Sequence, residues 1–81
     1  MTCIATFYSH FGAIRFKKLC EANGWSARVM PVPRDLSSSC GTCVRYEGSE
    51  ISPCNQIPEE VEQIVEVTPS GYTCRYRAAD S

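Results

Sequence analysis

The sequence lacks a long apolar run and a strong excess of charge of either sign. In this chain of 81 residues, no apolar segment approaches the ~18 residues of a membrane span. Eight Lys and Arg residues against nine Asp and Glu residues give a formal net charge of −1. We therefore expect neither a membrane nor a nucleic-acid partner. The first residues show no basic segment followed by an apolar stretch, so we expect no signal peptide and a cytoplasmic protein.

Cysteine, by contrast, is abundant in so short a chain. The six cysteines are Cys3, Cys20, Cys40, Cys43, Cys54 and Cys74. In an exported mini-protein six cysteines would indicate three disulfides, but the expected reducing compartment argues against a disulfide scaffold. Cys3, Cys20 and Cys74 lie in segments that read as core elements, and we expect them to pack as small apolar residues. Cys54 lies in a turn-like segment and is expected to be an exposed thiol.

The length indicates a single domain over residues 1–81. Apolar and β-branched residues predict strands, and Ser9 is a plausible N-cap for the helix that follows the first strand. A second helix is expected from Ile57 to Val67, because Pro58 suits a first helical turn and the apolar residues recur at helical spacing. The expected strands are Thr2–Ser9, Trp25–Val32, Thr42–Gly48 and Tyr72–Arg77, and the first expected helix is His10–Gly24.

The predicted order of elements is β-α-β-β-α-β. This order favours an α+β fold, a ferredoxin-like βαββαβ sandwich in which two helices cover one face of an antiparallel sheet. The segment PVPRDLSSSCGTC, from Pro31 to Cys43, would then join the second and third strands at the solvent-accessible rim of the sheet.

The segment Pro31–Cys43 has the composition of a reactive thiol site. A thiol attacks only as the thiolate, which positive charge and hydrogen-bond donors stabilise. Arg34 is a permanent cation in this segment, and Gly41 leaves the backbone beside Cys40 unobstructed. Three consecutive hydroxyl side chains can donate hydrogen bonds to a sulfur anion: Ser37, Ser38 and Ser39.

Cys43 completes a Cys-Gly-Thr-Cys pair with Cys40, and three interpretations of this pair stay open. In the first, Cys43 assists the release or retention of a sulfur or selenium atom carried on Cys40. In the second, the pair supplies two ligands of a zinc or other metal site that Cys54, Cys74 or His10 completes. In the third, the pair is the redox centre of a thiol-disulfide protein. His10 could also serve as a proton donor or thiolate partner, although a capping or surface role is commoner.

The segments YSHFGAIRFKKLCEANGW and ARVMPVPRDLSSSCGTCVRY resemble a family of small bacterial and archaeal proteins described as selenium/sulfur carriers. The proline-arginine step, the serine run and the Cys-Gly pair are its specific part. The resemblance implies a protein that is not an enzyme, in which Cys40 holds sulfur or selenium as a persulfide or selenosulfide. It also implies a donor of the cysteine desulfurase type and a sulfur- or selenium-accepting enzyme as partners, with no cofactor beyond the carried atom. The resemblance does not extend to Cys43.

Overall fold

The apolar segment near the start of the chain forms the central strand of a sheet. In the computed structural model, which describes residues 1–78, β1 (Thr2–Phe7) is buried from Cys3 to Phe7. It pairs antiparallel with β3 (Thr42–Glu47) and with β4 (Val61–Thr68). Because both faces of β1 are covered, its sequence is a continuous apolar run and not an alternation of apolar and polar residues.

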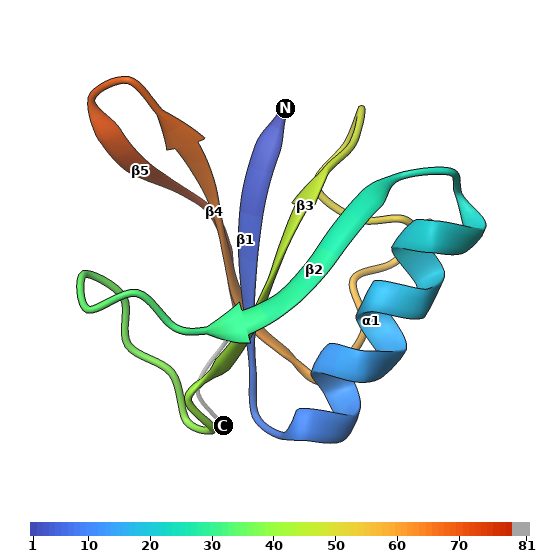
Figure 1. The fold of residues 1–81 in the computed structure, drawn as a ribbon, viewed down its shortest axis with the longest axis horizontal. Helices are drawn as coiled ribbons and strands as arrows, with labels where there is room; N and C mark the ends of the chain where they lie inside the picture. The colour runs from blue at the N-terminus through green and yellow to red at the C-terminus, as the bar shows by residue number, and fades with distance from the viewer. Residues whose placement is uncertain (79–81) are drawn as a thin grey trace.

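Five antiparallel strands form the sheet, in the order β2-β3-β1-β4-β5 (Figure 1). The two edge strands are β2 (Ser26–Pro31) and β5 (Gly71–Arg77). β3 is inserted between β1 and β2, which are joined by the helix, so this half of the chain is a split βαβ unit. The predicted strands are therefore confirmed as elements, and a fifth strand, β4, joins them.

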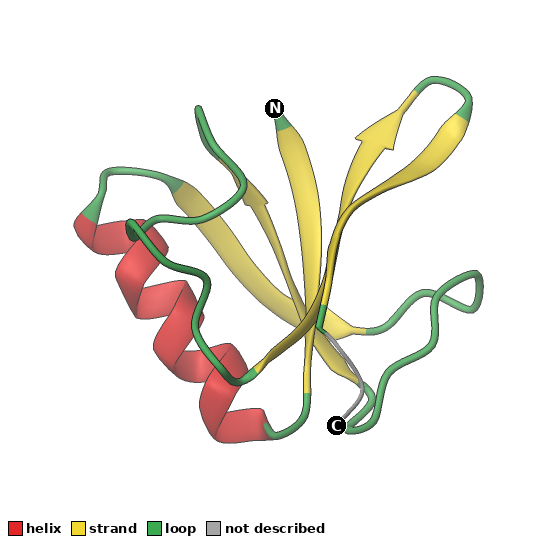
Figure 2. Ribbon diagram, turned by 180° about the vertical axis from the view of Figure 1, so that it is seen from behind, coloured by secondary structure: helices red, strands yellow, loops and turns green. Residues whose placement is uncertain are grey.

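One helix, α1 (His10–Ala22), packs against one face of the sheet (Figure 2). The predicted cap is confirmed, because Ser9 Oγ accepts a hydrogen bond from the amide of Gly12 at 3.3 Å. The helix buries Ala13, Phe16 and Cys20 against the sheet. Within residues 1–78, no helix is long and apolar enough to span a membrane.

The predicted second helix is wrong, because most of Ile57–Val67 belongs to strand β4. Thr6 pairs with Gln63 and Phe7 pairs with Val61, so Glu62 is an extra residue in β4, a β-bulge. The bulge places Val61 on the helix side of the sheet together with Ile64, and this three-residue spacing imitates one face of a helix. The α+β class and the antiparallel sheet are confirmed, but the described chain has one helix and five strands in place of the βαββαβ arrangement.

Two apolar clusters lie on opposite faces of the sheet. The helix-side cluster is built around stacked and tilted aromatic rings: Phe7, Phe16, Tyr46 and Trp25. The opposite cluster contains Ile4, Cys43 and Val65 and is partly covered by residues 32–41, which we call the cysteine loop. The cysteine loop and α1 therefore extend from opposite sides of the sheet (Figure 2). The prediction that Cys74 packs in the core is wrong, because its side chain is exposed on β5.

Candidate functional site

The cysteine loop connects β2 to β3, and a backbone hydrogen bond joins the two ends of the loop. The amide of Val32 donates to the carbonyl of Gly41 at 3.1 Å, and the amide of Leu36 donates to the carbonyl of Pro33 at 3.0 Å. Val32 and Leu36 pack on the cluster of Ile4, Cys43 and Val65, which lies on the helix-free face, the face of the sheet opposite α1. The first half of the loop is thus fixed by apolar contacts and by a tight turn after Pro33.

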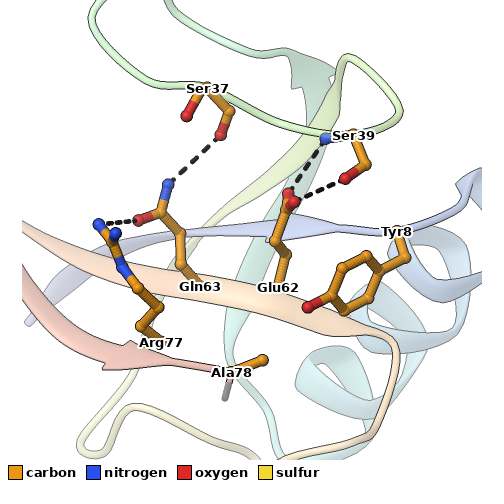
Figure 3. Close-up of a pocket in the computed structure, with 7 residues that line it drawn as sticks. All are labelled: Tyr8, Ser37, Ser39, Glu62, Gln63, Arg77 and Ala78. Atoms are coloured by element: carbon orange, nitrogen blue, oxygen red, sulfur yellow. Dashed lines mark hydrogen bonds between the residues drawn. The ribbon is translucent and has the colours of Figure 1, made fainter. Parts of the chain in front are cut away.

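Glu62 holds the second half of the cysteine loop. Its carboxylate accepts hydrogen bonds from the amide of Ser39 at 3.1 Å and from Ser39 Oγ at 2.6 Å (Figure 3). Thr6 Oγ1 donates to the same carboxylate at 3.3 Å. The β-bulge at Glu62 directs this side chain at the loop, as bulges do beside functional sites.

A polar cleft of about 360 Å³ lies between the cysteine loop and the β4–β5 edge. Gln63 Nε2 donates to the carbonyl of Ser37 at 3.3 Å, and Arg77 Nη2 donates to Gln63 Oε1 at 3.4 Å (Figure 3). Tyr8 and Ala78 complete the lining with Ser39 and Glu62. A row of hydrogen bonds therefore joins the loop to two neighbouring strands.

Cys40 lies where the cysteine loop meets the start of β3 and the start of α1. Its side chain is half-buried and packs against the helix-side cluster, and Sγ donates to the carbonyl of Thr42 at 3.5 Å. The amide of Cys40 donates to Ser38 Oγ at 3.4 Å. Thr42 Oγ1 forms a hydrogen bond of 2.7 Å with His10 Nδ1 at the helix N-terminus. His10 thus contacts Thr42, the residue whose carbonyl holds the Cys40 thiol.

Cys43 has a different environment from Cys40. It lies on β3 in the cluster of the helix-free face with 0% of its surface exposed, and its Sγ donates to the carbonyl of Pro31 at 3.6 Å. Burial, with a smaller contribution from Cys40, raises the pKa of the Cys43 thiol to about 11. At neutral pH this thiol is protonated and out of reach of solvent.

The other predicted site residues hold the loop in place more than they approach the sulfur. Ser38 Oγ donates to the carbonyl of Phe7 at 3.4 Å, and Ser39 Oγ donates to Glu62, so both hydroxyls anchor the loop. The side chain of Ser37 is exposed. Arg34 is exposed and has no ion pair within residues 1–78. Gly41 has a φ of 73°, which side chains other than glycine rarely adopt, so its role in the structure is to make the turn into β3.

Sequence reasoning missed Glu62, Gln63 and Thr42 as parts of the site. Glu62 and Gln63 were expected on the predicted second helix, where a carboxylate has no reason to face the cysteine segment. The signal for a strand was present in the β-branched residues Val61, Ile64, Val65 and Val67. Thr42 carries no motif of its own, and its importance comes from the contact with His10.

The six cysteines and the single histidine do not gather into a metal centre in the described part of the chain. In residues 1–78, no group of three or more His, Cys, Asp or Glu side chains is placed to hold a metal ion. Cys54 is half-buried and Cys74 is exposed on β5.

The amino-acid sequence matches a known protein family. The family model described as "Putative Se/S carrier protein-like" matches residues 2–68, so the chain belongs to this family, which confirms the resemblance. Among curated proteins, the uncharacterized protein YtiA of Escherichia coli (strain K12) is 42% identical over 38 residues, which is 47% of this chain and 45% of YtiA. The matched segment thus covers less than half of that relative. No solved structure matches the chain significantly.

Proposed function

We propose that this protein carries a sulfur or selenium atom on Cys40 and delivers it to an acceptor protein. The observation that carries the proposal is the position of Cys40 in a chain of this family. Its thiol is half-exposed at the end of a loop that Glu62 and Thr42 help to hold, while Cys3, Cys20 and Cys43 are buried. A covalent adduct on a fixed loop keeps a reactive, diffusible atom available to one acceptor.

The loading of Cys40 is a thiol exchange, in which one bond to sulfur forms as another breaks. The Cys40 thiolate attacks the terminal sulfur of a donor persulfide, a new Sγ–S bond forms, and the donor S–S bond breaks with its thiolate as the leaving group. A donor selenosulfide reacts in the same way with selenium as the transferred atom. The donor is a protein of the cysteine desulfurase type, and the carrier itself catalyses no reaction.

Delivery to the acceptor follows one of two routes. An acceptor thiolate can take the outer atom directly, which leaves Cys40 as a free thiolate. Alternatively, the Cys43 thiolate attacks Cys40 Sγ and expels hydrosulfide or hydroselenide, and the resulting disulfide needs a dithiol reductant to return to two thiols. Because Cys43 is buried with a pKa of about 11, this second route requires the cysteine loop to open, and we favour direct transfer.

Arg34 and the serine hydroxyls are the proposed stabilisers of the loaded atom. Ser38 and Ser39 act through the loop, because their hydroxyls bond to Phe7 and Glu62. Arg34 is the cation of the loop and is solvent-exposed, so it can turn toward a terminal anion. The metal module and the thiol-disulfide enzyme rest on the spacing of Cys40 and Cys43 alone.

The test is the loading of purified protein by a cysteine desulfurase with cysteine or selenocysteine, followed by intact mass measurement and peptide mapping. Cys54→Ser is the matched control, because Cys54 is the other half-buried loop thiol. Wild type and Cys54→Ser should gain one reductant-labile sulfur or selenium atom, and Cys40→Ser should gain none. An adduct that persists in Cys40→Ser, or no adduct on the wild type, would contradict the proposal.

A further inference from the structure

Three large apolar side chains are exposed near the start of α1. Phe11 is 81% exposed, and Tyr8 and Ile14 are each 48% exposed. Phe11 and Ile14 are three residues apart on the helix and therefore share its solvent face. Lone exposed apolar residues need no explanation, but a group of this kind on a small domain is typical of a binding surface.

The N-terminal end of α1 is tied to the segments that flank Cys40. The hydrogen bond between His10 and Thr42 ties the first residue of α1 to the start of β3, and the bond from Ser38 to the carbonyl of Phe7 ties the cysteine loop to the end of β1. The start of α1 and the end of the cysteine loop consequently lie at the same end of the sheet (Figure 1).

Tyr8 connects the helix face to the cysteine loop. It lines the polar cleft beside Ser37 and Ser39 (Figure 3). It also lines a second, wide hollow of about 550 Å³ with Arg15, Glu59 and Glu60. The surface therefore continues from the loop across Tyr8 to α1.

In the described part of the chain, one cation of the helix face, Lys18, is left to pair with a carboxylate of a partner. Arg15 is paired with Glu60 at 3.2 Å, and Lys17 is paired with Glu21 at 2.9 Å. Lys18 is exposed and has no ion pair within residues 1–78. It lies on the same helix face as Phe11, about 10 Å further along the axis.

We propose that Tyr8, Phe11 and Ile14 are the docking surface for the protein that donates sulfur or selenium to Cys40. The occupant is a persulfide-bearing protein with an apolar pocket for Phe11 beside its reactive cysteine and a carboxylate facing Lys18. This inference rests on the proposed function. Transfer requires the donor sulfur to reach bonding distance of Cys40 Sγ, so a protein donor must cover the surface around the cysteine loop. An exposed aromatic side chain beside that loop is the kind of anchor that dominates binding energy.

The experiment compares a protein donor with a small one. The second-order rate of Cys40 loading is measured with a persulfide-loaded cysteine desulfurase and with inorganic polysulfide, for wild type, Phe11→Ser and Lys18→Glu. Tyr72→Ser is the control, because Tyr72 is also a partly exposed aromatic residue, 37% exposed on β5. Circular dichroism melting verifies that each variant is folded.

With the desulfurase, Phe11→Ser should load about tenfold more slowly than wild type, as expected for loss of an interface anchor. Lys18→Glu should slow loading mainly at low ionic strength, because a charge at the rim of an interface acts on association. Tyr72→Ser should match wild type with both donors, and polysulfide should load all four proteins at the same rate.

Each of the other outcomes would contradict the proposed function, the docking surface or both. If the desulfurase does not load the wild type, the proposed function fails and the docking surface fails with it, whether or not polysulfide loads Cys40. If both donors load the wild type and Phe11→Ser is unaffected with the desulfurase, the docking surface alone fails. The docking surface alone also fails if Phe11→Ser slows both donors equally. If the wild type is a dimer by light scattering and Phe11→Ser is a monomer, the surface belongs to a second copy of this chain and the donor assignment is wrong.

Discussion

Burial distinguishes two thiols that the sequence presents as a pair. Cys40 and Cys43 are separated by only Gly41 and Thr42, yet the Cys40 side chain packs toward the helix side and Cys43 lies in the cluster of the opposite face. Spacing alone therefore indicates neither which of the two thiols is accessible nor on which face of the sheet each sulfur lies. Which thiol is accessible depends on the strand that begins at Thr42, since successive strand residues point to opposite faces.

The buried thiol of Cys43 makes stability depend on pH above the ordinary titration range of cysteine. Its pKa rises from 9.0 to about 11 on folding, so between these values the folded protein binds more protons than the unfolded chain. The stabilisation is complete below pH 9 and is lost as pH rises to 11, at up to about 1.4 kcal/mol per pH unit. Urea unfolding from pH 8 to 11 should show this fall in the free energy of unfolding.

Cys43→Val isolates the contribution of this thiol, because valine has a similar volume and does not titrate. The variant should have a flatter pH dependence between pH 9 and 11 than wild type. Cys20, whose pKa burial raises to about 12, contributes in both proteins and cancels in the comparison. Cys74→Val, at an exposed position, is the control and should follow wild type. Equal slopes for wild type and Cys43→Val would show that the Cys43 thiol titrates as it does in the unfolded chain.

At the scale of elements, local patterns predicted every helix and strand of residues 1–78 except β4. The helix from His10 was predictable because its cap and its buried residues Ala13, Phe16 and Cys20 all agree. Residues 57–67 offered conflicting signals, a proline and acidic residues typical of a helix start against a run of β-branched residues. Most of these residues form a strand, because β4 pairs with both β1 and β5 in the sheet.

Gly12 shows how packing between elements reverses a helix propensity. In an exposed helix interior, replacing glycine by alanine stabilises by about 1 kcal/mol. Here a Cβ on Gly12 would lie 2.5 Å from Cβ of Glu60, in the segment that leads into β4. We therefore expect Gly12→Ala to lower the free energy of unfolding by about 1–3 kcal/mol, the cost of overpacking.

Chemical denaturation of Gly12→Ala and of a control, Lys18→Ala, tests whether Gly12→Ala lowers the free energy of unfolding. Lys18 is exposed on the same helix, so Lys18→Ala should stay within about 0.5 kcal/mol of wild type. A Gly12→Ala protein more stable than wild type would mean that the chain before β4 can move away from α1 at little cost.

At the scale of the whole molecule, the candidate site depends on contacts that no local pattern encodes. The sequence predicted that the segment from Pro31 to Cys43 connects two adjacent strands, and the β2–β3 pairing confirms it. The anchoring of that segment by Glu62 and Gln63 arises only because β1 lies between β3 and β4 in the sheet. Such long-range neighbours follow from strand order, which requires the correct assignment of β4.

The same strand order predicts how protection from hydrogen exchange is distributed over the molecule. β1 is bonded on both edges and buried, whereas β5 is bonded only to β4 and is exposed at every residue except the half-buried Tyr76. Exchange measured by mass spectrometry should therefore be faster by at least about tenfold in peptides of β5 than in peptides of β1. Equal protection would mean that the free edge of β5 is covered in solution. A tenfold dilution would then decide what covers it, because pairing with a second copy weakens on dilution and a contact within one chain does not.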